Sequence, residues 1–345
     1  MSPAAVSNKP LQVAVVGLGR LGRRHAENLA TSVPGANLCA VCSPVNTELE
    51  WARDQLRVPH LYHEYAALLA HPGLDAVFLV TPTSLHADQI IAALKAGKHV
   101  FCEKPLSLEL ADCQRVTEEA ARHPELKVMI GFVRRFDASY QDAYQKIQEG
   151  MIGTPFMVYS QTCDENDPDG FFVKFSPTSG GIFLDCSVHD IDLARWLLGK
   201  AQPVRVFSSG LTAIHHDLQQ FKDVDNGVAI CEFDNGRLAT FYASRTMAHG
   251  HDTMTEITGT AGRLTVGGNP RKNRVMIADA QGIRNECTLS FFDRFEDAFL
   301  AEVRHFVDAV RHRKPLALDL DDSTQATRIG IALRESLLTK QPVLF

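Results

Sequence analysis

The chain has 345 residues, which corresponds to about two domains at roughly 150 residues each. Its 35 lysines and arginines against 41 aspartates and glutamates give a net charge of −6, without the basic block that nucleic acid or an anionic membrane requires. No apolar run approaches the roughly 20 residues that span a bilayer, and residues 1–10 contain no apolar signal segment. We therefore expect a soluble, cytoplasmic protein without nucleic-acid or membrane partners.

Residues 1–131 alternate short apolar runs with helical patterns. The predicted strands are 11–16, 38–42, 76–80, 99–102 and 128–131. The predicted helices are 21–31, 46–57, 64–70, 84–96 and 108–123, with Ser84 as an N-cap and Gly97 just after a helix end. Continuous apolar strands separated by helices are typical of a parallel sheet covered on both faces. We predict a doubly wound α/β Rossmann domain over residues 8–131.

After residue 150 the strand candidates become longer and alternate in polarity. They are 156–162, 204–212, 228–233, 238–245, 255–258 and 274–278, followed by helices at 294–311 and 321–338. Asn235-Gly236 between two of them is a strong hairpin signal. We predict an α+β domain over residues 132–345, built on a large, open, mostly antiparallel sheet, with C-terminal helices able to pack back on the first domain.

A glycine-rich segment follows the first strand and opens the first helix: Gly17-Leu-Gly19-Arg20-Leu21-Gly22. In this context the glycines let the backbone approach a pyrophosphate, while the helix N-terminus supplies N–H donors. The ribose-binding acid expected about 20 residues later is replaced by Ser43, and no cation follows until Arg53. The pattern predicts a dinucleotide, with NAD as the working cofactor and NADP not excluded.

Two further segments combine groups suited to proton transfer. Glu103-Lys104-Pro105 follows the fifth strand, where ligands bind in open α/β sheets, although a surface ion pair is the plain alternative. Asp185, His189 and Asp192 are spaced i, i+4, i+7 along one predicted helix after Gly180-Gly181. A carboxylate one turn from an imidazole can fix its tautomer and charge, although a solvated polar stripe would show the same spacing.

Other polar residues give weaker signals. Arg134-Arg135 is either solvent-facing or orients hydroxyl groups, and the acidic loop 164–175 is expected to be solvated. The histidine pairs at 60/63 and 249/251 lack the ligands of a structural zinc site, so we assign no metal. Eight cysteines in a chain of this length do not indicate a disulfide scaffold.

Taken together, these elements resemble the glucose–fructose oxidoreductase/inositol dehydrogenase/MocA (Gfo/Idh/MocA) family over essentially the whole chain. The segments that carry the resemblance are Gly17-x-Gly19-x-x-Gly22-x-x-His25, Thr81-Pro82-Thr-Ser-Leu-His86, Glu103-Lys104-Pro105, Gly131-Phe-Val-Arg134-Arg135-Phe-Asp and Gly180-Gly181-x3-Asp185-x3-His189-Asp190-x-Asp192. The arginine-containing segment looks most like the inositol dehydrogenase branch.

The resemblance implies hydride transfer from a ring secondary alcohol of an inositol, of scyllo or myo type, or of a related polyol or sugar, to NAD. It implies a catalytic set that also binds substrate, Lys104, Asp185 and His189, with Arg134 and His251 as further substrate contacts. It implies cofactor contacts at Gly17, Gly19, Arg20, Leu21, Gly22, Ser43, Thr81, Pro82, His86, Glu103 and Lys104. It also implies a homodimer or homotetramer formed through the open sheet.

Two departures from the family pattern keep alternatives open. Ser43 stands where NAD-preferring members often have Asp, and His251 stands where the inositol enzymes show Tyr. An aldose or anhydrosugar dehydrogenase using NAD or NADP is the second hypothesis. A non-catalytic regulator that binds a dinucleotide is the third, although such a protein needs no proton-transfer set.

Overall fold

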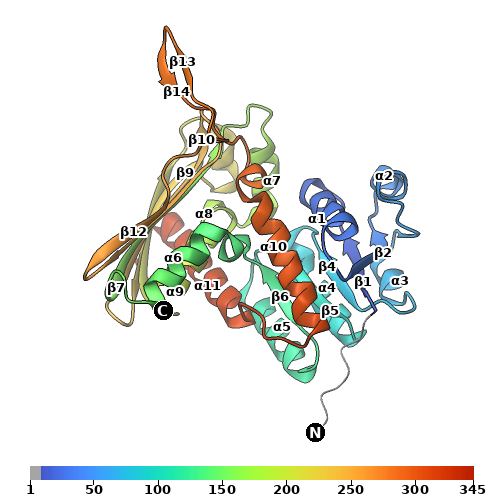
Figure 1. Cartoon of the computed structure of the whole chain (residues 1–345). Coiled ribbons are helices and arrows are strands. Elements are labelled where there is room, and N and C mark those ends of the chain that lie inside the picture. Colours follow the sequence, from blue (N-terminus) through green and yellow to red (C-terminus); the bar gives the residue numbers. More distant parts are fainter. Residues whose placement is uncertain (1–8) are drawn as a thin grey trace. The chain divides into compact units, whose positions relative to one another are not determined.

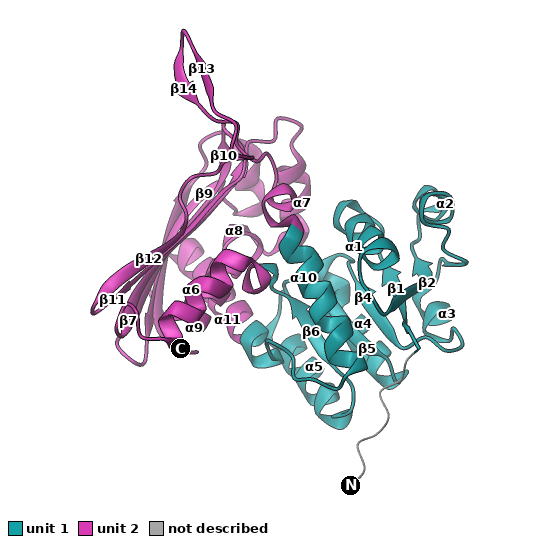
Figure 2. Cartoon of the chain, in the orientation of Figure 1, with its two compact units in different colours: residues 1–133, 297–324 teal, residues 134–296, 325–345 magenta. Residues whose placement is uncertain are grey.

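The computed structural model describes residues 9–345, which form two compact units (Figures 1 and 2). Unit 1 contains the chain up to residue 133 together with residues 297–324, and unit 2 contains residues 134–296 and 325–345. The expected start of the first domain at residue 8 lies outside the described residues. Within residues 9–345, no helix is both long and apolar enough to cross a bilayer.

Unit 1 is built on a six-stranded parallel sheet in the order β3-β2-β1-β4-β5-β6. Its strands are β1 (Leu11–Val16), β2 (Ala36–Cys42), β3 (His60–Tyr62), β4 (Ala76–Leu79), β5 (His99–Glu103) and β6 (Val128–Gly131). The helices between them are α1 (Arg20–Thr31), α2 (Asn46–Leu56), α3 (Tyr65–Leu69), α4 (Thr83–Lys95) and α5 (Leu110–Arg122). The order reverses between β1 and β4, as in a doubly wound sheet, which confirms the predicted Rossmann class.

The central strands of unit 1 are buried on both faces, as continuous apolar runs require. All four residues of β4 and the three valines of β1 are buried. The sequence did not indicate β3, a three-residue strand with no fully buried residue. Helix α4 begins after Pro82, so the expected N-cap at Ser84 was wrong, whereas Gly97 lies just past its end at φ +72°, as predicted.

Unit 2 contains a seven-stranded mixed sheet in the order β12-β11-β7-β10-β9-β8-β15. Its strands are β7 (Pro155–Glu165), β8 (Pro203–Leu211), β9 (Asn226–Phe233), β10 (Leu238–Met247), β11 (Asp252–Gly259), β12 (Gly262–Gly267) and β15 (Val343–Leu344). Only the β7–β10 pair is parallel. This mostly antiparallel sheet confirms the predicted class of the second domain.

Helices and short elements complete unit 2. They are the 3₁₀ helices η1 (Val133–Phe136) and η2 (His216–Phe221), helices α6 (Ala138–Gln148), α7 (Phe171–Ser179), α8 (Ile182–Asp185), α9 (Val188–Leu197) and α11 (Leu320–Thr339), and the hairpin β13 (Ile277–Asp279)–β14 (Gly282–Arg284). Helices α8 and α9 pack on one face of the sheet (Figure 1). Helix α10 (Phe291–Arg311) is kinked at Phe295, and the division between the units falls inside this helix, after Glu296. Helix α11 also crosses the division, since its residues 320–324 belong to unit 1.

The expected single helix through residues 182–196 was wrong. Helix α8 ends at Asp185, and α9 starts at Val188 after Cys186 and Ser187. The apolar periodicity continues through this junction because the residues on both sides pack against the same sheet, so the pattern does not reveal the break. Asp185 and His189 therefore belong to two consecutive short helices rather than to one helix face.

A buried ion pair joins the start of unit 2 to α9. Arg135 donates from Nη2 and Nε to the two carboxylate oxygens of Asp192, at 2.6 and 2.8 Å, and both side chains are almost fully buried. Bidentate pairing of this kind is strong and geometrically specific. Asp192 therefore stabilises the interior of unit 2 and does not belong to a solvated polar stripe.

We predict that Asp192→Ala strongly destabilises the protein, because a buried guanidinium loses the carboxylate that two of its donors contact. The expected loss of unfolding free energy is about 3–5 kcal/mol, measured by urea unfolding. The matched control is Asp54→Ala, which removes an equally short but exposed pair with Arg53 and should leave the midpoint unchanged. A loss below about 1 kcal/mol for Asp192→Ala would contradict this interpretation of the pair.

Candidate active site

The glycine-rich turn of unit 1 has the geometry that a pyrophosphate requires. Gly17 adopts φ +86°, and a Cβ atom there would lie 2.5 Å from the carbonyl oxygen of Val80. A Cβ on Gly22 would lie 2.0 Å from the carbonyl oxygen of Gly17, so the helix approaches the turn too closely for any side chain. The first turn of α1 contains Arg20 and Leu21 and no acid, which suits an anion at its N-terminus.

The end of β2 has an acid that the sequence pattern did not locate. Ser43 is fully buried, and its Oγ donates a 2.5 Å hydrogen bond to Oε2 of Glu48, from the first turn of α2. The same Oγ accepts from the backbone N–H of Val45 at 3.1 Å. A carboxylate therefore lies at this strand end although position 43 is a serine, because the Glu48 side chain reaches back to it.

The loop after β4 is tied to the segment after β5 by a buried histidine. The two ring nitrogens of His86 lie 2.8 Å from the carbonyl oxygen of Pro105 and 2.9 Å from that of Thr81. Burial lowers the pKa of His86, even though both carbonyl groups favour the charged ring. His86 thus connects the segments that follow β4 and β5, both of which carry predicted cofactor contacts. Pro82 occupies the N-cap position of α4.

Glu103 at the end of β5 points inward. Its Oε1 lies 2.7 Å from Nε2 of His25 on α1, and its Oε2 accepts from the backbone N–H of Lys104 at 3.3 Å. Glu103 is buried, whereas Lys104 is half-buried. Glu103 therefore fixes the backbone of the strand end, and Lys104 is the member of the segment that reaches an accessible surface.

In unit 2 the side chains of Asp185 and His189 are half-buried, whereas Cys186, Ser187, Val188 and Asp190 around them are buried. Oδ2 of Asp185 accepts a 3.0 Å hydrogen bond from the fully buried Arg245. A partly exposed carboxylate and imidazole at the junction of α8 and α9, backed by a guanidinium, can hold and move a proton.

Gly181 allows a carboxylate, rather than a ligand, to approach the start of α8. A Cβ at Gly181 (φ +86°) would lie 3.2 Å from Oδ1 of Asp223. That oxygen accepts from the backbone N–H of Ile182 at 3.0 Å, and Oδ2 accepts from Arg245 at 3.1 Å. The close approach that the glycine pair suggested is therefore made by Asp223 of the same unit.

Arg134 is held in a buried polar network. Its guanidinium donates to Asp190 at 2.8 Å and to Thr162 at 2.7 Å, and only 3% of the residue is exposed. Ser160 and Thr162 both donate to Asp190, each at 2.6 Å. This network anchors the residue that follows His189, so Arg134 orients α9 within unit 2.

His251 is positioned by an acid that the sequence analysis placed in solvent. Nδ1 of His251 lies 2.9 Å from Oδ1 of Asp164, and the ring is only 2% exposed. Burial disfavours the Asp164 carboxylate, but its hydrogen bond with His251 and the charge of Arg245 hold the pKa below its usual value. The expectation of a solvated acidic loop was wrong for Asp164. Asp164 and His251 are 87 residues apart in the chain, so local sequence patterns do not predict their contact.

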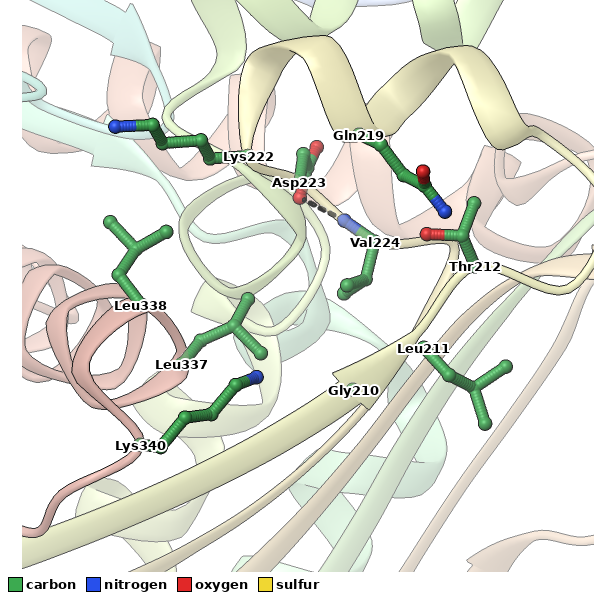
Figure 3. Close-up of a pocket in the computed structure, with 10 residues that line it drawn as sticks. All are labelled: Gly210, Leu211, Thr212, Gln219, Lys222, Asp223, Val224, Leu337, Leu338 and Lys340. Atoms are coloured by element: carbon green, nitrogen blue, oxygen red, sulfur yellow. Dashed lines mark hydrogen bonds between the residues drawn. The ribbon is translucent and has the colours of Figure 1, made fainter.

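The cavity shown in Figure 3 lies elsewhere in unit 2 and measures about 540 Å³. Lys222, Asp223 and Val224 line it beside η2, and Leu337 and Leu338 face them from α11. It contains none of the residues predicted to bind substrate or cofactor, so its volume alone does not identify it as the active site.

The chain matches two family models and several named proteins. Residues 11–132 match the family described as "Oxidoreductase family, NAD-binding Rossmann fold", and residues 144–345 match "Oxidoreductase family, C-terminal alpha/beta domain". The chain is 40% identical over 334 residues to scyllo-inositol 2-dehydrogenase (NAD(+)) of Bacillus subtilis (strain 168), covering 96% of each chain. It is 34% identical to myo-inositol 2-dehydrogenase of Thermotoga maritima, covering 96% of this chain and 98% of the relative.

A solved structure is also similar along nearly the whole chain. It is scyllo-inositol dehydrogenase from Lactobacillus casei with bound NAD(H) and scyllo-inositol, at 37% identity and a TM-score of 0.94. The match covers 97% of this chain and 99% of that one.

Proposed function

The chain belongs to the Gfo/Idh/MocA oxidoreductase family, and we propose that it oxidises a ring secondary alcohol of an inositol, of scyllo or myo type, with NAD. The observation that carries the proposal is the pair Asp185 and His189, half-buried at a helix junction and backed by Arg245. A dinucleotide-binding regulator has no need of such a pair. The relatives named as inositol dehydrogenases favour a cyclitol over an aldose.

We propose different roles for the two predicted domains. We assign cofactor binding to the first, residues 8–131, and substrate binding to the second, residues 132–345. The glycine turn of residues 17–22, with Thr81, Pro82 and Glu103, fits NAD because no side chain fills the turn and no acid opposes an anion there. When bound, the nicotinamide supplies the hydride acceptor. The free, mostly buried thiols suit a cytoplasmic enzyme.

The proton and the hydride leave the substrate by separate routes. His189 removes the proton of the reacting hydroxyl, and the carboxylate of Asp185 stabilises the imidazolium that results. Lys104 donates to the hydroxyl oxygen, so that negative charge building there is neutralised as the carbon gives up its hydride. Arg134 and His251 are the further substrate contacts in this proposal. Asp190 holds the side chain of Arg134, and Asp164 holds that of His251.

We predict that His189→Ala lowers kcat by about 10²–10⁴-fold at pH 7, because the hydroxyl loses its general base. Activity should recover partly at high pH, where hydroxide can remove the proton. The measurement is NAD reduction on a panel of inositols and aldoses, with the exposed His216→Ala as the control. Wild-type turnover of aldoses alone would favour the sugar dehydrogenase, and binding of NAD without any turnover would favour the regulator.

Glu48 is the residue that we expect to select NAD. Its carboxylate lies at the end of β2, the strand end at which Rossmann folds bind the ribose, so charge repulsion would weaken NADP binding. Glu48→Gln should raise kcat/KM with NADP about tenfold or more, with little change for NAD. The control is Glu50→Gln on the same helix, which is exposed. Unchanged selectivity in Glu48→Gln would show that another group sets the preference.

The outer face of the unit 2 sheet supports a proposed homodimer or homotetramer. Phe207 on β8 is directly paired with Ile230 on β9, and these side chains are 42% and 43% exposed. Val228, two residues along β9, is 51% exposed on the same face. Apolar side chains clustered on one face of an open sheet are typical of a subunit interface.

We predict that Ile230→Asp lowers the oligomeric state, because a charge in the centre of this face opposes its burial. Size-exclusion chromatography with light scattering measures the mass at several concentrations. The control is Val275→Asp in the loop before β13, which is more exposed than Ile230 but lies outside the sheet. An unchanged mass for Ile230→Asp would contradict the assignment of this face.

A further inference from the structure

Unit 1 contains a buried cluster of titratable groups that the mechanism above does not use. His25 on α1, Glu103 on β5 and Glu302 on α10 each place one nitrogen or oxygen atom within 4.8 Å of the others. Glu302 is fully buried, and neither of its carboxylate oxygens has a hydrogen-bond partner. A buried carboxylate in this state requires compensation by a cation or a proton.

A metal ion does not fit the distances. Two ligands of one tetrahedral zinc ion lie about 3.3 Å apart, given metal–ligand bonds of about 2.0–2.1 Å. Nε2 of His25 and Oε1 of Glu103 are 2.7 Å apart, which is the length of a hydrogen bond. These two groups are therefore bound to each other rather than arranged around an ion.

The two carboxyl groups differ in their hydrogen bonds. Glu103 accepts from His25 and from the backbone N–H of Lys104, and such bonds favour the charged form. Glu302 has no comparable donors, and its neighbour is the Glu103 carboxylate. Phe101 and Phe299 pack against the ring of His25, so apolar groups surround this part of the cluster.

We propose that Glu302 is a neutral carboxylic acid at neutral pH, and that it acts as a positioning residue: its buried side chain fills the space beside Glu103 without adding a charge, which leaves the Glu103 carboxylate against His25 and fixes the strand end carrying Lys104. A second negative charge beside Glu103 would compete for the same donors and push its carboxylate away. The charge state of Glu302 is independent of the proposed function, whereas the consequence for Lys104 depends on it.

Burial and charge both act on the groups of this cluster. Burial and then the charge of Glu103 raise the pKa of Glu302 well above its usual value. Cys102 and His86 also sense the charge of Glu103, and burial is the larger influence on both. The charged and titratable groups around the cluster are thus His25, Cys102, Glu103, Lys104 and His86.

The first test measures stability against pH and requires no substrate. A carboxyl group with a raised native pKa binds a proton that the unfolded chain releases above about pH 4.3, so its contribution to stability is lost as pH rises. Glu302→Gln cannot ionise. The unfolding constant of the wild type relative to Glu302→Gln should therefore rise by at least about thirtyfold between pH 5 and pH 8, with a limit of tenfold per pH unit.

The exposed Glu296→Gln on the same helix is the control and should show a pH-independent ratio. An infrared band of a protonated carboxylic acid at pH 7, lost in Glu302→Gln, would identify the proton directly. A flat ratio for Glu302→Gln, or a ratio that changes only above about pH 6.5 where histidine titrates, would overturn the assignment of the proton to Glu302.

The second test separates positioning from stability through the kinetics of folded enzyme. Glu302→Ala should lower kcat about tenfold or more while KM for NAD stays within about twofold, because the cavity left beside Glu103 lets that carboxylate shift, and a small displacement of Lys104 impairs the chemical step. Glu302→Gln should restore kcat. Normal kcat in Glu302→Ala would overturn the positioning role. Absence of wild-type turnover on every inositol would instead reject the proposed function, leaving the stability result valid.

Discussion

Every charge buried in this protein has to be compensated within the fold, and this constraint determines where its chemically useful groups lie. In unit 2 the compensation comes from guanidinium groups. Arg135 pairs with Asp192, Arg134 with Asp190, and Arg245 with Asp185 and Asp223. Helix α9 therefore carries two carboxylates, Asp190 and Asp192, each paired with a buried arginine. His189, on the same helix, is consequently held on a rigid support, as a proton acceptor requires.

Unit 1 meets the same constraint in another way. Two carboxylates at most 4.8 Å apart would repel each other by about 3.5 kcal/mol at an effective dielectric constant of 20. No arginine is placed against Glu302 among the described contacts, and retaining a proton removes the repulsion at lower cost than burying a further ion pair. The result is a strand end at Glu103 with one well-defined negative charge, next to the lysine assigned to catalysis.

The sequence was sufficient for the fold class, because continuous apolar strands in unit 1 and alternating strands in unit 2 express burial directly. It did not reveal the break after Asp185, since the apolar periodicity continues into α9 and no glycine or proline marks the junction. It also missed contacts made by tertiary structure. Asp164 meets His251, which is 87 residues further along the chain, and no local pattern encodes this approach.

The two kinds of compensation respond differently to pH. A guanidinium remains charged throughout the range in which proteins are stable, so Arg245 and Arg134 stay cationic beside Asp185 and Asp190. The proton proposed on Glu302 is exchangeable in principle, and burial is what keeps it in place. The cations that support α9 therefore keep their charge while, in the proposed mechanism, His189 gains and loses a proton in each turnover. The support of Lys104, by contrast, depends on excluding water from the cluster around Glu302. Substitutions that admit water near Phe101 or Phe299, which pack on His25, should consequently disturb Lys104 from a distance.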